Sequence, residues 1–563
     1  MSVISRFDPP VSTHLTRASL TRAGLEAYRT QFFTLAASCF AEALRLDPTD
    51  GAAQINLANA LWSLGALDYA ATIAEAALAQ AHPTVQFEAW MINGAIRLAR
   101  GNALGAVNAY QAAVTCAPSA VTAHAGLAAA LLQAGHSQAA RAQADVALTL
   151  DPACTHAQAS KAASLAAQAD FASAITAYDQ LIAANPNDAA AWLNRGAAKL
   201  DLDLLADAQA DLATATRLDP SSLEAWVTSG YAACLAGHLT EAITHAEHAI
   251  SLQPDHPQPH WNRGIALLLL GDYRSGFAAY EWRKRHKIHG QAFTTLPAPL
   301  WQGEISQGKH LLIRAEQGMG DTIMLARFIP ELAARGLRIT LACAASLHRL
   351  LSPLPVTLIT LTTQTDDHHF DYAIDQMSLP LALNLTRESI PAPHAYLTAD
   401  PALQASAQSW LAPHTNPLHR KIGLVWAGNP GHDNDRRRSL PPGILAPLLN
   451  DMRAGARFSP IALQHGPRRG EYSLPDAITQ VHDYADTAAL ISTLDAVISV
   501  DTSVAHLAGA LGVPCHILLS TACDWRWGLT GRESPWYPSV RLHRQTQLGD
   551  WQAPLASLQA ALA

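Results

Sequence analysis

The chain has 563 residues, of which 49% are hydrophobic and 15% charged. This balance excludes a disordered chain, and the length is too great for one compact core, so we expect several domains. The net charge of −8 and the lack of a basic stripe disfavour nucleic acid as a partner.

Three features of the sequence indicate the cytoplasm. The seven cysteines are scattered and no pair has CxxC spacing, which disfavours a disulfide framework and a zinc site. The first residues lack the basic and then apolar character of a signal peptide. No apolar run reaches the length of about 18 residues that a membrane span requires. We therefore expect a cytoplasmic protein without a transmembrane segment.

Prolines recur every 34 residues in the first half of the chain. They are Pro118, Pro152, Pro186, Pro220 and Pro254. A period of 34 residues is that of the tetratricopeptide repeat, which is a pair of antiparallel helices. Because proline cannot continue a helix, each of these prolines is expected to follow the second helix of a repeat.

Repeat frames that start at residues 17, 51, 87, 121, 155, 189, 223 and 257 share small residues. The eighth position is glycine or alanine in every frame. Small side chains allow the two helices of a pair to approach closely. The array resembles the tetratricopeptide family over residues 17–290, and this resemblance implies a helical superhelix whose concave groove binds a protein or peptide.

Asparagine occupies the sixth position of three frames, as Asn56, Asn194 and Asn262. In the family this position faces the groove, and similar asparagines of O-linked N-acetylglucosamine transferases grip the backbone of a substrate peptide. The resemblance therefore implies a partner groove at these residues, for a protein or peptide acceptor. The alternative is that the three asparagines are ordinary solvated residues.

The ends of the array carry no repeat signature. Residues 1–16 are expected to be a lead-in. The basic, aromatic segment Tyr280–His286 is typical of a final capping helix with a solvated face. Residues 291–308 contain two prolines and two glycines and are expected to be a linker.

From residue 309 the pattern changes to short apolar runs that alternate with helical stretches. His310–Arg314, Arg338–Cys343 and Val356–Leu361 are suited to buried parallel strands. The order strand, loop, helix, strand predicts a parallel α/β lobe, which we place at residues 309–400.

A second α/β lobe is expected at residues 418–563, after a polar, proline-rich stretch. The apolar run 496–500 leads directly into a predicted helix that starts near Thr502. The start of this helix offers free N–H groups and the positive end of a dipole to an anion. Ligands of such sheets bind at the carboxyl ends of the strands, so the expected site lies between two facing lobes.

Three motifs in these lobes resemble the heptosyltransferase-like enzymes of glycosyltransferase family nine. They are GMGD at residues 318–321, GLVWAGNP at 423–430 and DTSVAH at 501–506. The last motif is specific, whereas a lone GxG such as that in the first is only supportive. The resemblance covers residues 309–550 and implies the two-lobed GT-B fold and a hexosyl- or heptosyltransferase-like activity. Such an enzyme moves a sugar from a nucleotide-sugar donor to an acceptor hydroxyl.

The resemblance also implies a role for each motif. The residue matching Asp321 is the general base that takes the proton of the acceptor hydroxyl, a step worth about 10²–10⁴ in rate. A basic residue matching Arg438 neutralises the diphosphate that leaves. The implied donor-binding residues are Gly318, Gly320, Asn429, Arg438, Asp501, Thr502, Ser503 and His506. No carboxylate cluster that would hold a divalent ion is evident in the sequence, so we expect no metal and no cofactor besides the nucleotide-sugar substrate.

The match to the family has two departures. Ser503 stands where heptosyltransferases usually carry glycine, and Arg438 where they carry lysine, which leaves the transferred sugar open. The combination of repeats and a two-lobed transferase also resembles O-linked N-acetylglucosamine transferase and the repeat-bearing flagellin glycosyltransferases of bacteria. This second likeness concerns architecture and not the site.

Each implied role has a structural alternative. Asp321 is of a type that caps helices, His506 could be a buried helix histidine, and Arg438 could belong to a solvated loop. The aromatic residues at 525–527 and 536–537 are interpreted as core or lobe-closing residues rather than sugar platforms. For the whole chain, the alternative to an enzyme is a protein-binding scaffold whose transferase domain is inert.

Overall fold

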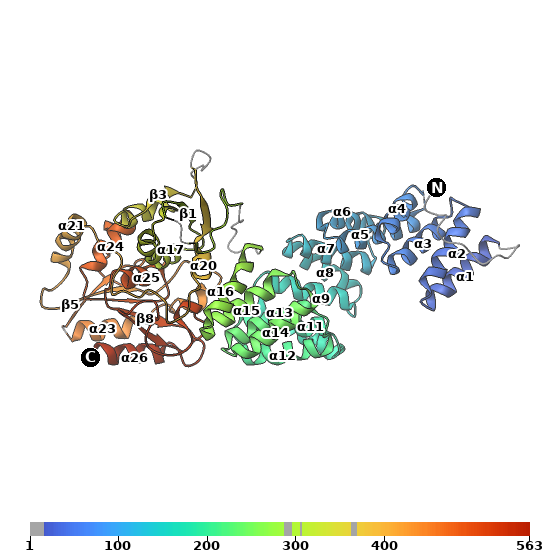
Figure 1. Ribbon diagram of the computed structural model, residues 1–563. Helices are drawn as coiled ribbons and strands as arrows, with labels where there is room; N and C mark the ends of the chain where they lie inside the picture. The colour runs from blue at the N-terminus through green and yellow to red at the C-terminus, as the bar shows by residue number, and fades with distance from the viewer. Residues whose placement is uncertain (1–15, 81, 286–294, 305–306, 362–368, 456) are drawn as a thin grey trace. The chain divides into compact units, whose positions relative to one another are not determined.

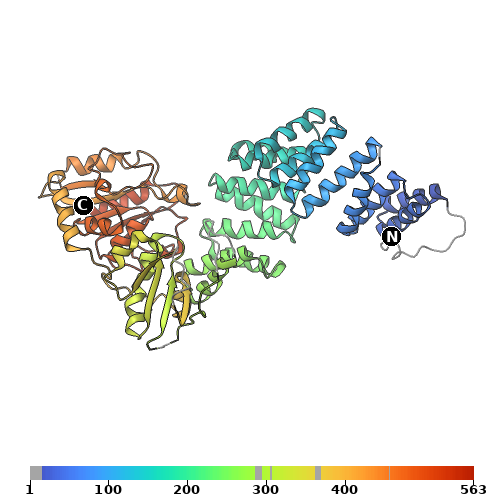
Figure 2. The ribbon, with the colours of Figure 1, turned by 90° about the horizontal axis from the view of Figure 1, so that it is seen from above.

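The computed structural model describes residues 16–80, 82–285, 295–304, 307–361, 369–455 and 457–563. The chain forms two compact units, Met1–Pro220 and Ser221–Ala563, whose ribbons are drawn in Figures 1 and 2. Residues 1–15 of the expected lead-in, 286–290 at the end of the expected repeats, and 291–294 and 305–306 of the expected linker lie outside the described residues.

The first unit is a series of antiparallel helix pairs that follow the repeat frames. The second helix of a pair ends two residues before the recurrent proline, as α6 does at Cys116 and α10 at Ala184. This agreement confirms the tetratricopeptide pattern. The helices are α1 (Arg17–Arg29), α2 (Phe33–Leu46), α3 (Gly51–Ser63), α4 (Leu67–Ala77), α5 (Pro83–Ala99), α6 (Ala103–Cys116), α7 (Val121–Gln133), α8 (Ser137–Leu150), α9 (Thr155–Ala167), α10 (Phe171–Ala184), α11 (Ala189–Asp201) and α12 (Leu205–Leu218).

Glycine at the eighth position of a frame makes room for a large side chain of the second helix. A Cβ atom on Gly24 would lie 2.6 Å from the ring of Phe40, and one on Gly94 would lie 2.8 Å from the ring of Tyr110. Both rings are buried. The small residues of the repeat are therefore fixed by the close approach of the paired helices.

The second unit begins with two more helix pairs of the same kind. These pairs are packed on the sheets that follow, because Tyr273, Phe277 and Tyr280 are buried in one core with Trp525 and Trp536. The last repeats are thus part of this unit. Their elements are α13 (Leu223–Leu235), α14 (Leu239–Leu252), α15 (Pro257–Leu270), α16 (Tyr273–Tyr280) and the 3₁₀ helix η2 (Glu281–Arg285).

The final element of the array is not the solvated cap that the sequence predicts. Arg283 of η2 is completely buried. Its guanidinium donates to both carboxylate oxygens of Glu316, at 2.6 and 2.9 Å, and to Ser378 Oγ at 2.8 Å. The prediction was wrong because the partners of Arg283 lie far away in the sequence, and an isolated basic segment looks solvated.

Two all-parallel sheets follow, in agreement with the predicted α/β class. Their strand orders are β3-β2-β1-β4 and β6-β5-β7-β8-β9, and we call the regions built on them the first lobe and the second lobe. The strands are β1 (His310–Arg314), β2 (Arg338–Cys343), β3 (Thr357–Thr360), β4 (Tyr372–Asp375), β5 (Arg420–Val425), β6 (Phe458–Ala462), β7 (Ala496–Ser499), β8 (Cys515–Leu519) and β9 (Val540–Arg544).

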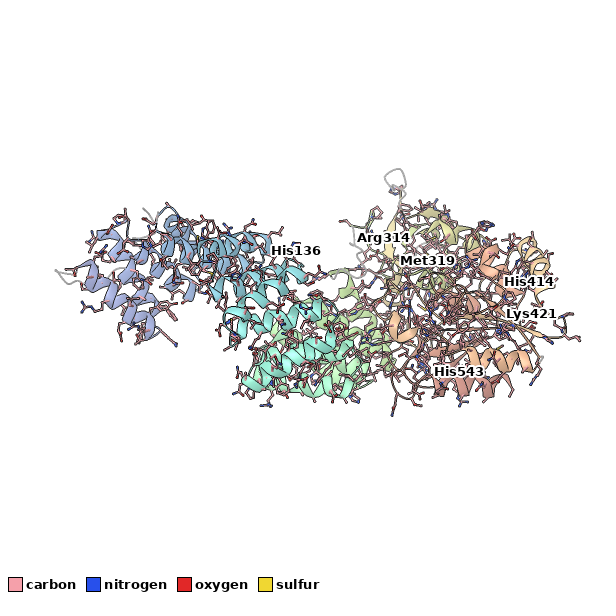
Figure 3. All side chains as sticks on the ribbon, turned by 180° about the vertical axis from the view of Figure 1, so that it is seen from behind. His136, Arg314, Met319, His414, Lys421 and His543 are labelled. Atoms are coloured by element: carbon pink, nitrogen blue, oxygen red, sulfur yellow. The ribbon has the colours of Figure 1, made fainter. Side chains whose placement is uncertain are left out.

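Helices connect these strands and cover the sheets. Figure 3 labels Arg314 and Met319 on either side of the first connection, and Lys421 and His543 on strands of the second lobe. The helices are α17 (Met319–Leu325), α18 (Ile329–Ala334), α19 (His348–Leu351), α20 (Leu379–Ala382), α21 (Pro401–Leu411), α22 (Asp435–Arg438), α23 (Ala446–Ala454), α24 (Tyr484–Ser492), α25 (Ser503–Ala510) and α26 (Gln552–Leu562).

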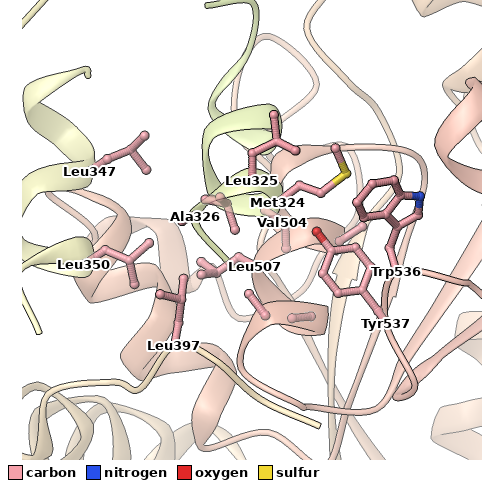
Figure 4. Packing of buried hydrophobic residues seen from close by; sticks show 14 of the residues in the cluster. Met324, Leu325, Ala326, Leu347, Leu350, Leu397, Val504, Leu507, Trp536 and Tyr537 are labelled. Atoms are coloured by element: carbon pink, nitrogen blue, oxygen red, sulfur yellow. The ribbon is translucent and has the colours of Figure 1, made fainter. Parts of the chain in front are cut away.

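The two lobes share an apolar core at α17 and α25. Figure 4 shows Met324 and Ala326 of the first lobe facing Val504 and Leu507 of the second. All four side chains are buried. Because each helix directly follows a central strand of its sheet, this packing brings the loops after β1 and β7 together.

Candidate functional site

The predicted site residues follow the carboxyl ends of strands where each sheet reverses its order. In the first sheet the chain passes from β1 outward to β3 and returns to β4 beside β1. In the second it passes from β5 to β6 and returns to β7. Ligands of parallel sheets bind at such reversals. Asp321 follows β1, Arg438 follows β5 and Asp501 follows β7, so all three lie at these points.

Asp321 has two partners, one in each lobe. Its Oδ2 accepts the N–H of Gly318 at 2.8 Å, which caps the start of α17. Its Oδ1 is paired with the guanidinium of Arg526 from the second lobe. Burial raises the pKa of Asp321, and the positive charge of Arg526 opposes this rise. Asp321 is therefore both the cap that the sequence allows and a charged group at the meeting point of the lobes.

Arg526 is the site residue that the sequence reasoning missed. It lies in the 3₁₀ helix η8 (Trp525–Trp527), after β8, and its side chain is only 7% exposed. Its Nη1 donates to Asp524 at 2.6 Å, and its guanidinium lies 4.4 Å from the centre of the Trp525 ring. The aromatic neighbours are buried as predicted. They had suggested a core segment and so concealed a buried cation.

Asp501 lies in an environment that disfavours its charge. Burial raises the pKa of Asp501 to about 6, the nearby carboxylate of Asp524 adds to the rise, and the guanidinium of Arg438 opposes it. Arg438 itself donates its Nε to Asp435 at 3.1 Å. Four carboxylates, those of Asp321, Asp435, Asp501 and Asp524, thus lie around two guanidinium groups, those of Arg438 and Arg526.

The loop after β5 brings Arg438 to this cluster. A Cβ atom on Gly428 would overlap Asp435 Oδ1 and would lie 2.6 Å from Arg438 Nη2, so the glycine leaves room for the pair in this arrangement. Asn429, which was expected to bind the donor, is exposed and its Oδ1 accepts the N–H of Gly431 at 3.1 Å. The structure therefore brings Arg438, but not the Asn429 side chain, to the charged cluster.

His506, the last residue of the motif at 501–506, contacts the motif at 318–321 of the first lobe. It is buried, its ring stacks on Trp527 with centres 5.0 Å apart, and its Nδ1 lies 2.9 Å from the hydroxyl of Tyr537. A Cβ atom on Gly320 would lie 2.7 Å from His506 Cδ2, so the motif of the first lobe touches that of the second. Burial, followed by the nearby Arg526, lowers the pKa of His506 well below its ordinary value. The imidazole is therefore neutral at pH 7.

The hydroxyls at the start of α25 are bonded within the second lobe. Thr502 Oγ1 lies 3.0 Å from Ser499 Oγ, and Ser503 Oγ lies 2.8 Å from the hydroxyl of Tyr484. Both residues still lie beside Asp501 at the end of β7. The backbone N–H groups at the start of the eight-residue helix α25 remain the feature of this segment that suits an anion.

The three asparagines expected in a partner groove have different surroundings. Asn56 and Asn194 are half-buried in the first unit. Asn262 belongs to the second unit and is only 5% exposed, because its Nδ2 donates to the carbonyl of Val227 and its Oδ1 accepts from Gln258. The structure therefore corrects the expectation for Asn262, whose amide is bonded to the preceding repeat and to its own helix.

A cavity of about 320 Å³ lies between the last repeats and the second lobe. Its walls include Tyr273 of α16, the exposed Arg387, and Trp525 and Trp527, which flank Arg526 in the sequence. One wall of this cavity is therefore the segment that carries Arg526. Among the residues that the structure describes, no group of His, Cys, Asp or Glu is arranged to hold a metal ion.

Comparison with known proteins identifies the helical part of the chain. The sequence model of the tetratricopeptide repeat family matches residues 21–85, 94–153, 160–222 and 196–257. Protein FlbA of Caulobacter vibrioides is 27% identical over 414 residues, which are 67% of this chain and 67% of that protein. No helix in the described part of the chain is long and apolar enough to cross a membrane.

The solved structures that match the chain have low overall similarity to it. A tetratricopeptide repeat protein from Parabacteroides merdae is 16% identical, with a TM-score of 0.38 over 45% of this chain and 98% of that chain. Pseudomonas aeruginosa PilF is 16% identical, with a TM-score of 0.32 over 37% of this chain and 95% of that chain. The family match and the observed helix pairs together show that the N-terminal part of the chain is an array of tetratricopeptide repeats.

Proposed function

We propose that the protein is a glycosyltransferase of the GT-B type. It would move a sugar from a nucleotide-sugar donor to a hydroxyl of an acceptor. The observation that carries this proposal is the charged cluster itself. Asp321, Arg438, Asp501 and Arg526 come from loops after β1, β5, β7 and β8, which are carboxyl ends of strands in both lobes. A base from one lobe and cations from the other are what transfer from a diphosphate requires.

The proposed reaction uses this division between the lobes. Asp321 accepts the proton of the acceptor hydroxyl, whose oxygen then forms a bond to the anomeric carbon of the sugar. The bond from that carbon to the diphosphate oxygen breaks, and its electron pair leaves with the nucleoside diphosphate. In this proposal Arg438, Arg526 and the N–H groups at the start of α25 stabilise the developing negative charge, which their positions after β5, β8 and β7 support.

The repeats are proposed to bring the acceptor, which would be a protein or a peptide. Tetratricopeptide arrays present extended surfaces for such partners. The packing of α16 against Trp525 supports a direct link between array and transferase lobes, because Trp525 precedes Arg526. The cavity lined by Tyr273 and Arg387 lies where α16 and Trp525 meet.

A second candidate is a protein-binding scaffold whose lobes have no activity. The observation that favours it is the bonding of Asp321. The pairing with Arg526 and the capping of α17 make Asp321 a weaker base than a buried carboxylate without these partners would be. Binding of a nucleotide separates the two candidates, since an inert scaffold needs none.

The test is a thermal-shift screen of the full chain with UDP, GDP, ADP and CDP and with sugar conjugates of each. A nucleotide at 100 times its dissociation constant stabilises the folded protein by about 2.7 kcal/mol. We expect the protein to bind the nucleotides of one nucleobase. Arg438→Gln should weaken that binding about tenfold or more. The matched control is Arg541→Gln. Arg541 is exposed near the amino end of the edge strand β9, whereas the charged cluster lies after the carboxyl ends of the strands. If no nucleotide shifts the melting of the wild-type chain, the scaffold is the better conclusion.

A further inference from the structure

Arg526 connects the candidate base of the first lobe with the candidate donor site of the second. It is paired with Asp321 across the lobes and with Asp524 in its own loop. Its charge also acts on Asp501 and on His506. One guanidinium therefore acts on Asp321, on Asp501 and on His506, which come from both lobes.

The hydrogen-bonding capacity of this guanidinium is not filled. Among the described residues, Nε of Arg526 has no acceptor although it is buried. A buried donor without an acceptor costs free energy, and the cost is greater for a charged group. An anionic oxygen that entered the cluster would supply the missing acceptor. Phosphate oxygens bind guanidinium groups well because two N–H groups can point at them together.

The same guanidinium restrains the candidate base. The positive charge of Arg526 stabilises the ionised form of Asp321, which makes this carboxylate a weaker acceptor of a proton. An incoming diphosphate and Asp321 would compete for one cation. Whichever of them holds Arg526 determines how basic Asp321 is.

We propose that Arg526 couples donor binding to the general base: its guanidinium moves from Asp321 to an oxygen of the donor diphosphate, and this releases Asp321 to accept a proton. This inference rests on the proposed function. It assigns Arg526 as a ligand of the donor phosphates and as the positioning residue that holds Asp321 until the donor is present. Asp321 would then take a proton from the acceptor only when the nucleotide-sugar donor is bound.

The coupling predicts an unusual effect of a mutation in the base. Asp321→Asn removes the competitor for Arg526 and keeps the shape of the side chain. The variant should bind the preferred nucleoside diphosphate several times more tightly than the wild-type protein does, while sugar transfer is lost. A base with no link to the donor would leave the affinity unchanged when it is replaced.

The experiment is isothermal titration of the full chain with UDP, GDP, ADP and CDP. Besides Asp321→Asn, it uses Arg526→Met, which should weaken binding about tenfold or more, and Arg526→Lys, which should recover part of the loss. The control is Arg349→Gln. Arg349 forms another ion pair between the lobes, with Asp483 and Asp486, so its loss tests whether looser lobes alone change affinity.

The outcomes separate this inference from the function on which it rests. Tighter binding by Asp321→Asn, weaker binding by the Arg526 variants and unchanged binding by Arg349→Gln support the coupling. If the wild-type protein binds a nucleotide and Asp321→Asn binds it equally or less well, the coupling is overturned and the proposed function stands. If Arg526→Met does not fold, Asp321→Asn and Arg526→Lys decide. If no nucleotide binds the wild-type protein, both proposals fall.

Discussion

At the scale of single residues, the charges of the cluster do not balance. Asp321, Asp435, Asp501 and Asp524 supply four carboxylates, and Arg438 and Arg526 supply two guanidinium groups. One of the carboxylates must therefore be the most difficult to ionise. Asp501 is that group, because burial and the neighbouring Asp524 raise its pKa to about 6. A nucleotide that brings more negative charge would add to this imbalance unless a proton is taken up.

The raised pKa of Asp501 predicts a stability that falls as pH rises. Below its ordinary value of 3.8 the group is protonated in the folded and unfolded states, and above about 6 it is ionised in both. The folded state therefore loses stability between these values. Asp501→Asn should raise the free energy of unfolding by about 3 kcal/mol at pH 7 and by only about half a kcal/mol at pH 4. Melting temperatures of both proteins at the two pH values measure this, and a gain that does not depend on pH contradicts it.

At the scale of elements, η2 fixes the last repeat to the first lobe. Arg283 is buried with Glu316, which follows β1, and with Ser378, which follows β4. Gln317, in the same loop as Glu316, donates to the hydroxyl of Tyr280 at 2.8 Å. The loop that leads to Gly318 is thus held from one side by the repeat array, which makes the array part of the support for Asp321.

Removal of Arg283 should therefore destabilise the second unit strongly. Arg283→Met leaves Glu316 buried without its cation, a loss that costs about 3–5 kcal/mol. Urea unfolding followed by tryptophan fluorescence reports this, because Trp525 lies in the same core. The control is Arg285→Gln two residues later, whose exposed ion pair with Asp255 is worth at most about 1 kcal/mol. Equal effects of the two substitutions would show that the buried pair has no special importance.

The same elements show what the sequence predicts and what it cannot. β1 and β2 are predicted to the residue because buried central strands are continuous apolar runs. β9 is missed because it is an edge strand, and the exposed Arg541 interrupts its apolar residues. Asp321 and Asp501 are found because they lie in recognisable motifs. Arg526 is not found, since tryptophans on both sides of it indicate a core and its partner Asp321 is 205 residues away.

At the scale of the whole molecule, the boundary between compact units does not coincide with the change in sequence pattern. The repeats continue to Tyr280, but the second unit begins at Ser221 and includes the last two helix pairs. Leu529 of the second lobe packs with Leu239 and Ala233, and Arg437 donates to the hydroxyl of Tyr231 at 3.2 Å. These helices thus have a function in holding the lobes, in addition to any binding of an acceptor.

This division predicts that equivalent turns of the array differ in their tolerance of an insertion. Pro220 and Pro254 occupy the same place in successive repeats, but the turn at Pro220 lies at the boundary of the units and the turn at Pro254 lies inside the second unit. Ten flexible Gly/Ser residues after Pro220 should leave the melting temperature of the second unit and its nucleotide affinity unchanged. The same insertion after Pro254 should lower the melting temperature by several degrees, because it separates α14 from α15, which pack together.

Differential scanning calorimetry and nucleotide titration of the two insertion variants test this prediction. Equal loss in both would mean that the complete array, and not only its last two pairs, supports the site.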